Sequence, residues 1–215
     1  AGIVQNGAGN VTITGPRTLT TAGGAVSFAT ALTLAGGANT TTIDTTGAGA
    51  TGGGNITFTS TVKPTTANTE RLTLNAGTAG DILFNQAIGS SGTPLGNLTI
   101  SNARHVTFNS TVDAFAVLQS AGTGNTTISG NMTALGGGID ITTDRISIGA
   151  GLNTGTKDLR LNTVNGTTQT GGFITSNQVL LISSGTGSFT LLQPNNNVAT
   201  QIAANLGGGA LSFLN

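Results

Sequence analysis

Short apolar triplets recur along the chain at intervals of 20 to 30 residues, and this recurrence strongly limits the folds that the chain can adopt. In each triplet one residue, usually Thr, separates two apolar residues, which is the period-2 pattern of a β-strand. Ile56-Thr-Phe58, Ile82-Leu-Phe84 and Val106-Thr-Phe108 are clear examples. The anchor positions, spaced by 30, 26, 24, 20 and 20 residues, are Phe28, Phe58, Phe84, Phe108, Ile128 and Ile148. Periods of this length predict stacked structural repeats with insertions in peripheral loops.

A unit of two or three short strands can bury its apolar face only by stacking on a neighbouring unit, strand over equivalent strand. The sequence therefore predicts an all-β fold, a right-handed parallel β-solenoid of roughly eight to ten coils over residues 1–215, the hand following the usual crossover preference. We expect Phe28, Phe58, Phe84 and Phe108 to point inward and the Thr residues within the triplets to point outward. The Gly-rich runs 47–54 and 136–138 are interpreted as corner insertions.

The composition favours a folded repeat protein over a disordered chain. It includes 35 Gly, 41 Thr and 21 Asn, but also 36% hydrophobic residues and no net charge, whereas disordered chains combine few aliphatic residues with high net charge. Seven basic and seven acidic residues provide no electrostatic footprint for nucleic acid. No apolar run is long enough to predict membrane insertion. The absence of Cys excludes disulfide frameworks and thiolate chemistry, and we expect no cofactor and no metal.

Several phrases of the chain resemble the β-solenoid repeat regions of filamentous-haemagglutinin-like exoproteins and other bacterial β-strand-repeat surface proteins. They are Leu74–Asn85, Gly92–Ile100, His105–Val112, Gln119–Ile128 and the tail Asn195–Phe213. The resemblance implies a secreted protein at the cell surface or in the extracellular matrix, serving as an adhesin, biofilm component or surface fibre. The Asn-Pro-Asn phrases of the family's secretion domain are missing, Gln193-Pro-Asn195 being the nearest, which places the chain in the repeat shaft.

Three patterns invite an enzymatic interpretation, and the sequence favours a non-enzymatic one for each. Residues 47–52 satisfy the G-x-G-x-x-G dinucleotide pattern, but a strand follows where that site needs a helix. His105 is the single histidine, near Ser101, Ser110 and Asp113, and no nucleophile elbow accompanies it. We expect an outward-facing surface histidine.

A polysaccharide lyase is the third and more serious enzymatic alternative, because such enzymes also use parallel β-helices. They need clustered carboxylates together with basic residues in a groove. Asp140, Asp144 and Arg145 are the densest such cluster, and a solvated ion pair on a coil surface is the expected explanation.

Outward positions of the strands form Thr-x-Thr-like pairs that could stack into a flat hydroxyl array. Such a surface is a candidate for binding ice or a polysaccharide, although Thr is also the polar residue that a strand best tolerates. The residues of this possible ligand face are Thr57, Thr59, Thr99, Ser101, Thr107, Asn109, Thr127 and Ser129.

The two ends of the chain suggest that it works by association. Open coils at Ala1 and Asn215 would expose strand edges, and Leu211–Leu214 is too apolar for a cap. Because net charge is near zero, electrostatic repulsion would not keep copies apart. We therefore expect the partners to be copies of the chain or flanking repeats of a longer parent chain, with glycans or neighbouring cell surfaces as possible further partners.

Overall fold

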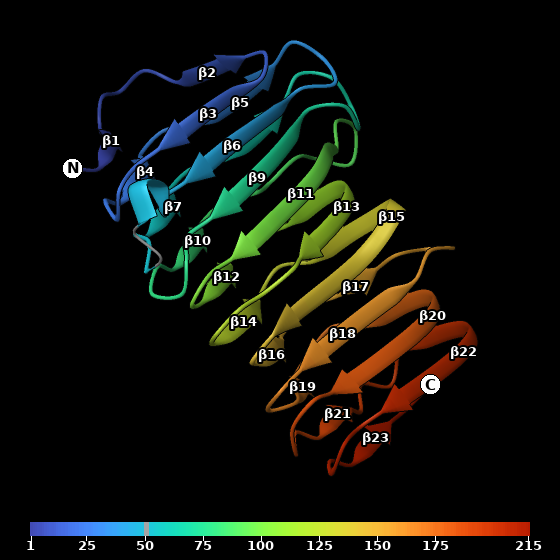
Figure 1. The fold of residues 1–215 in the computed structure, drawn as a ribbon. Helices are drawn as coiled ribbons and strands as arrows, with labels where there is room; N and C mark the ends of the chain where they lie inside the picture. The colour runs from blue at the N-terminus through green and yellow to red at the C-terminus, as the bar shows by residue number, and fades with distance from the viewer. Residues whose placement is uncertain (50–51) are drawn as a thin grey trace.

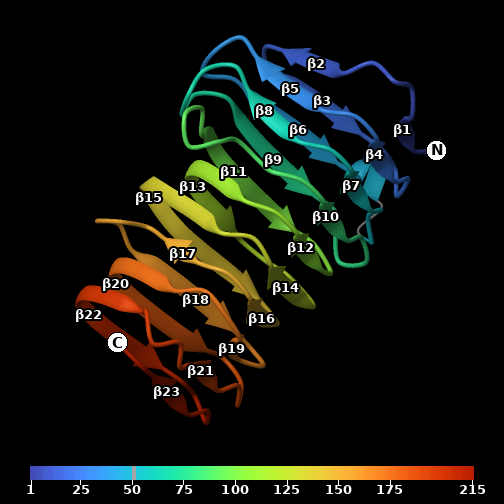
Figure 2. The same cartoon turned by 180° about the vertical axis from the view of Figure 1, so that it is seen from behind.

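The computed structural model describes residues 1–49 and 52–215 and is a β-solenoid of about ten turns, with essentially no helix. The N- and C-termini lie at opposite ends of a rod, and the chain winds between them as a right-handed coil (Figures 1 and 2). Every pairing between its named strands is parallel, as the repeat pattern predicts. The only helical element among the described residues is the 3-10 turn η1, Gly47–Gly49.

The first sheet receives one short strand from each coil. Its ten strands, in spatial order, are β1 (Ile3–Gln5), β4 (Val26–Phe28), β7 (Ile56–Phe58), β10 (Ile82–Phe84), β12 (Val106–Phe108), β14 (Asn125–Ile128), β16 (Arg145–Ile148), β19 (Thr167–Gln169), β21 (Phe189–Leu191) and β23 (Leu211–Phe213).

The second sheet faces the first across the core and contains the longer strands. They are β3 (Arg17–Thr20), β6 (Thr40–Asp44), β9 (Arg71–Asn75), β11 (Leu95–Asn102), β13 (Val112–Gln119), β15 (Met132–Thr143), β17 (Leu152–Asn153), β18 (Leu159–Thr163), β20 (Ile174–Ser183) and β22 (Asn197–Asn205).

A third face completes each coil. In the first coils it is a separate sheet of β2 (Val11–Thr14), β5 (Leu32–Ala35) and β8 (Val62–Pro64). In later coils the same face continues at the beginning of β13 and β15, which bend into the second sheet. One inward ladder runs along it, made of Val11, Leu32, Val62, Ile88, Val112, Met132, Leu152 and Ile174.

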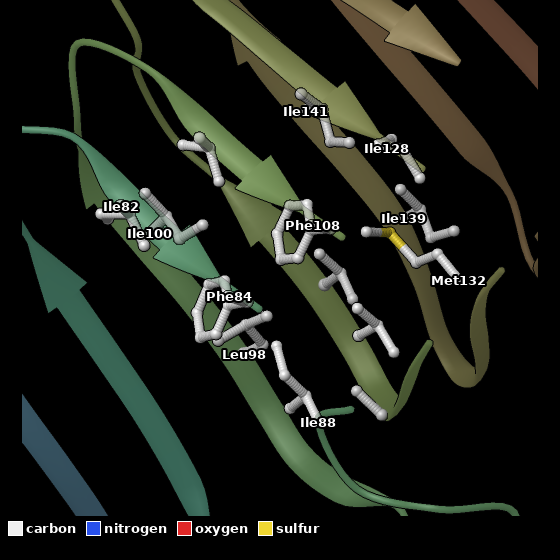
Figure 3. Close-up of a cluster of buried hydrophobic side chains, with 14 of the residues drawn as sticks. Ile82, Phe84, Ile88, Leu98, Ile100, Phe108, Ile128, Met132, Ile139 and Ile141 are labelled. Carbon is white, nitrogen blue, oxygen red and sulfur yellow. The ribbon is translucent and has the colours of Figure 1, made fainter. Parts of the chain in front are cut away.

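The anchor positions of the sequence pattern occupy a single column inside the first sheet. Phe28, Phe58, Phe84 and Phe108 are in register and at most 3% exposed. Their rings stack nearly parallel, with centroids 5.5, 4.9 and 5.2 Å apart, and Figure 3 shows Phe84 and Phe108 among the buried aliphatic side chains of both sheets. Offset stacking of this kind adds about 0.5–1.5 kcal/mol per pair beyond burial. The column continues in register through Ile128 and Ile148, as the spacing predicts.

Some of the polar side chains that enter the core pair with one another. Gln169 takes the anchor position below Ile148, and its amide exchanges hydrogen bonds with Asn196. Thr126 donates to Gln119 Oε1 across the core at 2.8 Å.

Glu70 is buried directly before strand β9 of the second sheet. Its carboxylate accepts hydrogen bonds from Thr65 Oγ1, Thr69 Oγ1 and the Thr66 N–H. Burial by itself raises the pKa of Glu70, but these hydrogen bonds together hold the pKa below its ordinary value.

Candidate ligand-binding faces

The outward middle positions of the first sheet form one continuous row along the rod, which we call the hydroxyl ladder. Its members, each in register with the next, are Val4, Ser27, Thr57, Leu83, Thr107, Thr127, Ser147, Thr168, Thr190 and Ser212. All except Val4 and Leu83 carry a hydroxyl group. Parallel strands repeat every ~4.8 Å, so the ladder presents hydroxyls at regular axial intervals.

A second outward column lies directly beside the ladder, at the residue that follows each strand. The N–H groups of Thr59, Asn109 and Ser129 each donate to a carbonyl of the preceding coil, so this column keeps the register of the sheet. Asn109 Nδ2 also donates to Asn85 Oδ1 at 3.1 Å. Only Thr59, Ser129 and Thr170 carry a hydroxyl group in this second column, so the paired hydroxyl array is discontinuous along the rod.

Six of the eight residues predicted for the ligand face are brought together on this sheet, and two are not. Those assembled are Thr57, Thr59, Thr107, Asn109, Thr127 and Ser129, all half-buried or exposed. Thr99 and Ser101 belong to β11 on the second sheet. Their phrase Leu-Thr-Ile-Ser has the same alternation as the first-sheet phrases, and alternation does not tell which side of a coil a strand occupies.

An ion pair and a histidine border the ladder where the strands of the first sheet begin. Arg104 donates to both carboxylate oxygens of Asp81, at 2.8 and 2.6 Å. These hydrogen bonds and the guanidinium charge lower the pKa of Asp81. His105 is exposed, as expected, and its Nδ1 accepts a hydrogen bond from the Asn125 N–H at 2.9 Å.

The outer face of the second sheet carries a groove that the sequence patterns did not reveal, which we call the axial groove. It has a volume of about 610 Å³ and is lined from six neighbouring strands, β11, β13, β15, β18, β20 and β22. These strands lie side by side in Figure 1, so the groove crosses them and runs along the rod. One row of its lining, in register, is Thr99, Leu118, Asp140, Arg160, Leu180 and Ala203.

A bulge and small side chains make room for the groove. Between Ala114 and Ala116 strand β13 has one residue, while its neighbour β15 has the three residues 135–137. Gly138, which follows the bulge, has φ +83°, and a Cβ there would collide with the Asp158 carbonyl oxygen. The run 136–138 was expected to be a corner insertion, but it lies inside β15, with its first two glycines in the bulge and Gly138 directly after it.

The carboxylates that suggested a lyase do not cluster. Asp140 pairs with Arg160, 20 residues along the chain, through a 2.7 Å contact from Nη1 to Oδ1. Asp144 accepts a hydrogen bond from Asn165 Nδ2, and Arg145 starts β16 on the first sheet. The expected ion pair on a coil surface thus exists, but its basic partner is Arg160 and not Arg145.

The residues that suggested a hydrolase are also dispersed. Ser101 lies on β11, Asp113 lies on β13, and His105 precedes β12 on the opposite sheet. Asp113 lines a separate hollow of about 330 Å³ together with Phe115 and Leu135, and burial raises its pKa.

The dinucleotide pattern is only partly described, because Ala50 and Thr51 lie outside the described residues. Gly47–Gly49 form η1, and the next element of regular structure is strand β7.

Comparison with family models, curated proteins and solved structures found no match for this chain. Over residues 1–49 and 52–215, no group of three or more His, Cys, Asp or Glu side chains is placed to hold a metal ion. No helix in the same residues has the length and apolarity needed to cross a membrane.

Proposed function

We propose that the chain is part of the structural and adhesive shaft of a secreted bacterial surface or extracellular-matrix fibre, acting by association of its coils with further coils. The observation that carries this proposal is that apolar side chains of the core reach the first and last described coils, where they are only partly buried. The resemblance of the repeat phrases to filamentous-haemagglutinin-like exoproteins supports the assignment to a surface fibre.

The N-terminal end of the core is an open hollow of about 560 Å³. Its lining includes Ile3, Val11, Leu19 and Phe28. At the other end Ile202, Leu211 and Phe213 are only partly buried. Stacked coils bury such side chains when another coil covers them.

The outermost strands of the first sheet are suited to further pairing. Among the described strands β1 pairs only with β4 and β23 only with β21, which leaves one edge of each unpaired. Neither β1, Ile-Val-Gln, nor β23, Leu-Ser-Phe, contains a charged residue that would oppose edge-to-edge pairing. The coils that would cover these edges belong to a second copy or to flanking repeats.

Substitution by lysine at the two ends of the hydroxyl ladder tests whether copies of the chain associate end to end. A copy stacked in register would place Ser212 beside Val4 of the next copy, so the double variant Val4→Lys/Ser212→Lys would bring two like charges together. The matched control, Thr57→Lys/Ser147→Lys, adds the same charge to inner positions of the same row.

We expect the wild-type chain and the control to form end-to-end assemblies by sedimentation velocity and electron microscopy, and the end variant to remain monomeric. A wild-type chain that stays monomeric at millimolar concentration would contradict association between copies. Flanking repeats would then remain as the source of further coils, to be tested by extending the chain at either end.

A second candidate function is supported by the regularity of the hydroxyl ladder. Rows of hydroxyls at fixed axial spacing could match an ordered surface such as ice or a crystalline polysaccharide. This function would reside on the first sheet and would not require association of the chain.

A further inference from the structure

We propose that the axial groove on the second sheet binds an extended, uncharged polysaccharide chain laid along the rod. This site is separate from the hydroxyl ladder and from the two ends of the rod. The inference therefore stands or fails independently of the proposed shaft function.

The shape of the groove suits a linear ligand. Its lining crosses six adjacent strands, and the five intervals of ~4.8 Å between them give a length of roughly 24 Å. Its volume of about 610 Å³ is within the range of sites that hold small organic ligands, ~300–1,000 Å³. A polymer with one repeating unit after another can follow such a channel along the axis.

The groups in the groove suit hydroxyl-rich ligands. Asn97, Gln178 and Gln201 each offer an amide that both donates and accepts, and Thr99 adds a hydroxyl. Neighbouring donors and acceptors of this kind match the adjacent hydroxyls of a sugar ring. Leu118 and Leu180, 38% and 37% exposed, provide apolar surface for the faces of the rings.

The charges in the groove disfavour a polyanion. Asp140 is neutralised by Arg160 at 2.7 Å, and Asp158 adds a further negative charge. A polyanionic glycan or a nucleic acid would need an excess of Lys and Arg along its path. An uncharged sugar needs no excess of basic residues along its path.

The position of the groove also disfavours an extended peptide. Peptides that add to sheets pair with the unpaired backbone groups of an edge strand. The groove lies on the face of the sheet, where the backbone groups of β13, β15 and β18 bond to strands on both sides. Only side chains are available for recognition, and their amides and hydroxyl favour a ligand that is itself rich in hydroxyls.

Isothermal titration with uncharged linear hexasaccharides tests the proposal directly. The probes are β-1,4-glucan, β-1,3-glucan and β-1,4-xylan hexamers, with oligogalacturonate as the charged comparison. We expect at least one uncharged hexamer to bind and oligogalacturonate to bind more weakly or not at all. If no uncharged hexamer binds at millimolar concentration, or if oligogalacturonate binds best, the proposal is wrong.

Two matched pairs of variants locate the binding. Ala116→Trp fills the part of the groove over β13 and should weaken binding at least about tenfold, while Thr33→Trp places the same ring on the third sheet and should change it less than about twofold. Arg160→Ala should weaken binding by about three- to tenfold, and Arg104→Ala, which breaks the other surface ion pair, should leave it unchanged.

Leu180→Lys keeps the test decisive if Ala116→Trp fails to fold. Leu180 is exposed, so a lysine there can be accommodated while its long side chain obstructs the groove. Circular dichroism establishes which variants are folded. Hexasaccharide binding that survives Leu180→Lys but is lost in Ser147→Trp, a change on the hydroxyl ladder, would place the site on the first sheet and overturn the proposal.

Discussion

Gln169 and Asn196, separated by 27 residues in the sequence, hold each other's side-chain amides inside the core with two 3.0 Å hydrogen bonds. Asn196 also accepts from the Ile174 N–H and donates to the Leu191 carbonyl, so the pair is tied to two further strands. Both residues are at most 5% exposed. A polar pair thus takes the place of an apolar anchor because each amide satisfies the other.

We predict that Asn196→Ala destabilises the fold more than the double variant Gln169→Leu/Asn196→Leu does. Both variants leave the Ile174 N–H and the Leu191 carbonyl without the Asn196 side chain, but only the single change also leaves the buried Gln169 amide unpaired, at a cost of about 1–3 kcal/mol. Urea unfolding of both variants measures the difference. A double variant less stable than Asn196→Ala would show that the apolar side chains do not fit this part of the core.

The stacked phenylalanines lead to a prediction about the middle of the rod. Phe84→Ala should lower the free energy of unfolding by about 3–5 kcal/mol, because the cavity would open between two stacked rings. Leu192→Ala, at a half-exposed position, is the control and should cost below about 1 kcal/mol. A similar loss in both variants would mean that the phenylalanine stack contributes little.

Glu70 should make the stability of the first coils depend on acid. Its pKa in the folded chain lies below the ordinary value of 4.5, so its contribution is present above that pH and is lost as the pH falls through the folded pKa. Acid titrations of unfolding should show this loss in the wild-type chain and not in Glu70→Gln.

Thr65→Val provides an intermediate case, because it removes one of the hydrogen bonds to the Glu70 carboxylate. It should move the folded pKa of Glu70 upward and reduce the acid-dependent loss without abolishing it. An acid dependence identical in the wild-type chain and in Glu70→Gln would assign the loss to other carboxylates.

The sequence predicted the architecture well because one repeated local pattern determines it. Phe28 to Ile148 could be aligned by spacing alone, and each aligned pair is a neighbouring pair in the first sheet. The column then changes to Gln169, where the apolar pattern is interrupted for one strand before it resumes at Leu191 and Phe213. Recognising that position requires its partner Asn196, which no local pattern indicates.

The candidate sites were harder to predict because they combine residues from different coils. Thr99 was predicted to share one ligand face with Thr57 and Thr107, yet it lies on the other sheet and lines the axial groove with Asp140 and Arg160. The groove depends on the bulge in β15 and on the register of six strands. Neither feature can be predicted from a local sequence pattern. The sequence signal was the Gly136–Gly138 run, which was open to a structural explanation as a corner insertion.

The lyase alternative predicts that the chain cleaves an acidic polysaccharide, and we expect no such cleavage. The chain should not cleave polygalacturonate, because Asp140 is paired with Arg160 and Asp144 is bonded to Asn165. The appearance of unsaturated products in the ultraviolet spectrum measures cleavage. Cleavage that disappears in Asp140→Asn would establish the enzymatic alternative and contradict a purely structural shaft.

Binding by the hydroxyl ladder can be tested by adding a hydroxyl where one is missing, as well as by blocking a hydroxyl that is present. Leu83 separates Thr57 from Thr107 in the row, so Leu83→Thr would join them into an uninterrupted series of hydroxyls. If the ladder binds an ordered surface, adsorption to crystalline cellulose or to growing ice should increase in Leu83→Thr. It should fall about tenfold in Thr127→Lys, since a protruding lysine prevents close contact across the flat row, and a tenfold change corresponds to 1.4 kcal/mol.

The matched control for the ladder is Thr33→Lys, which places the same side chain on the outward side of β5 in the third sheet. Adsorption should not change in this variant. Because the hydroxyls repeat with the strand spacing of ~4.8 Å, binding should depend on how many consecutive coils contribute, so Thr107→Lys/Thr168→Lys should weaken adsorption more than either single change. Equal adsorption by the wild-type chain, Leu83→Thr and Thr127→Lys would show that the Thr residues serve only to form the strands.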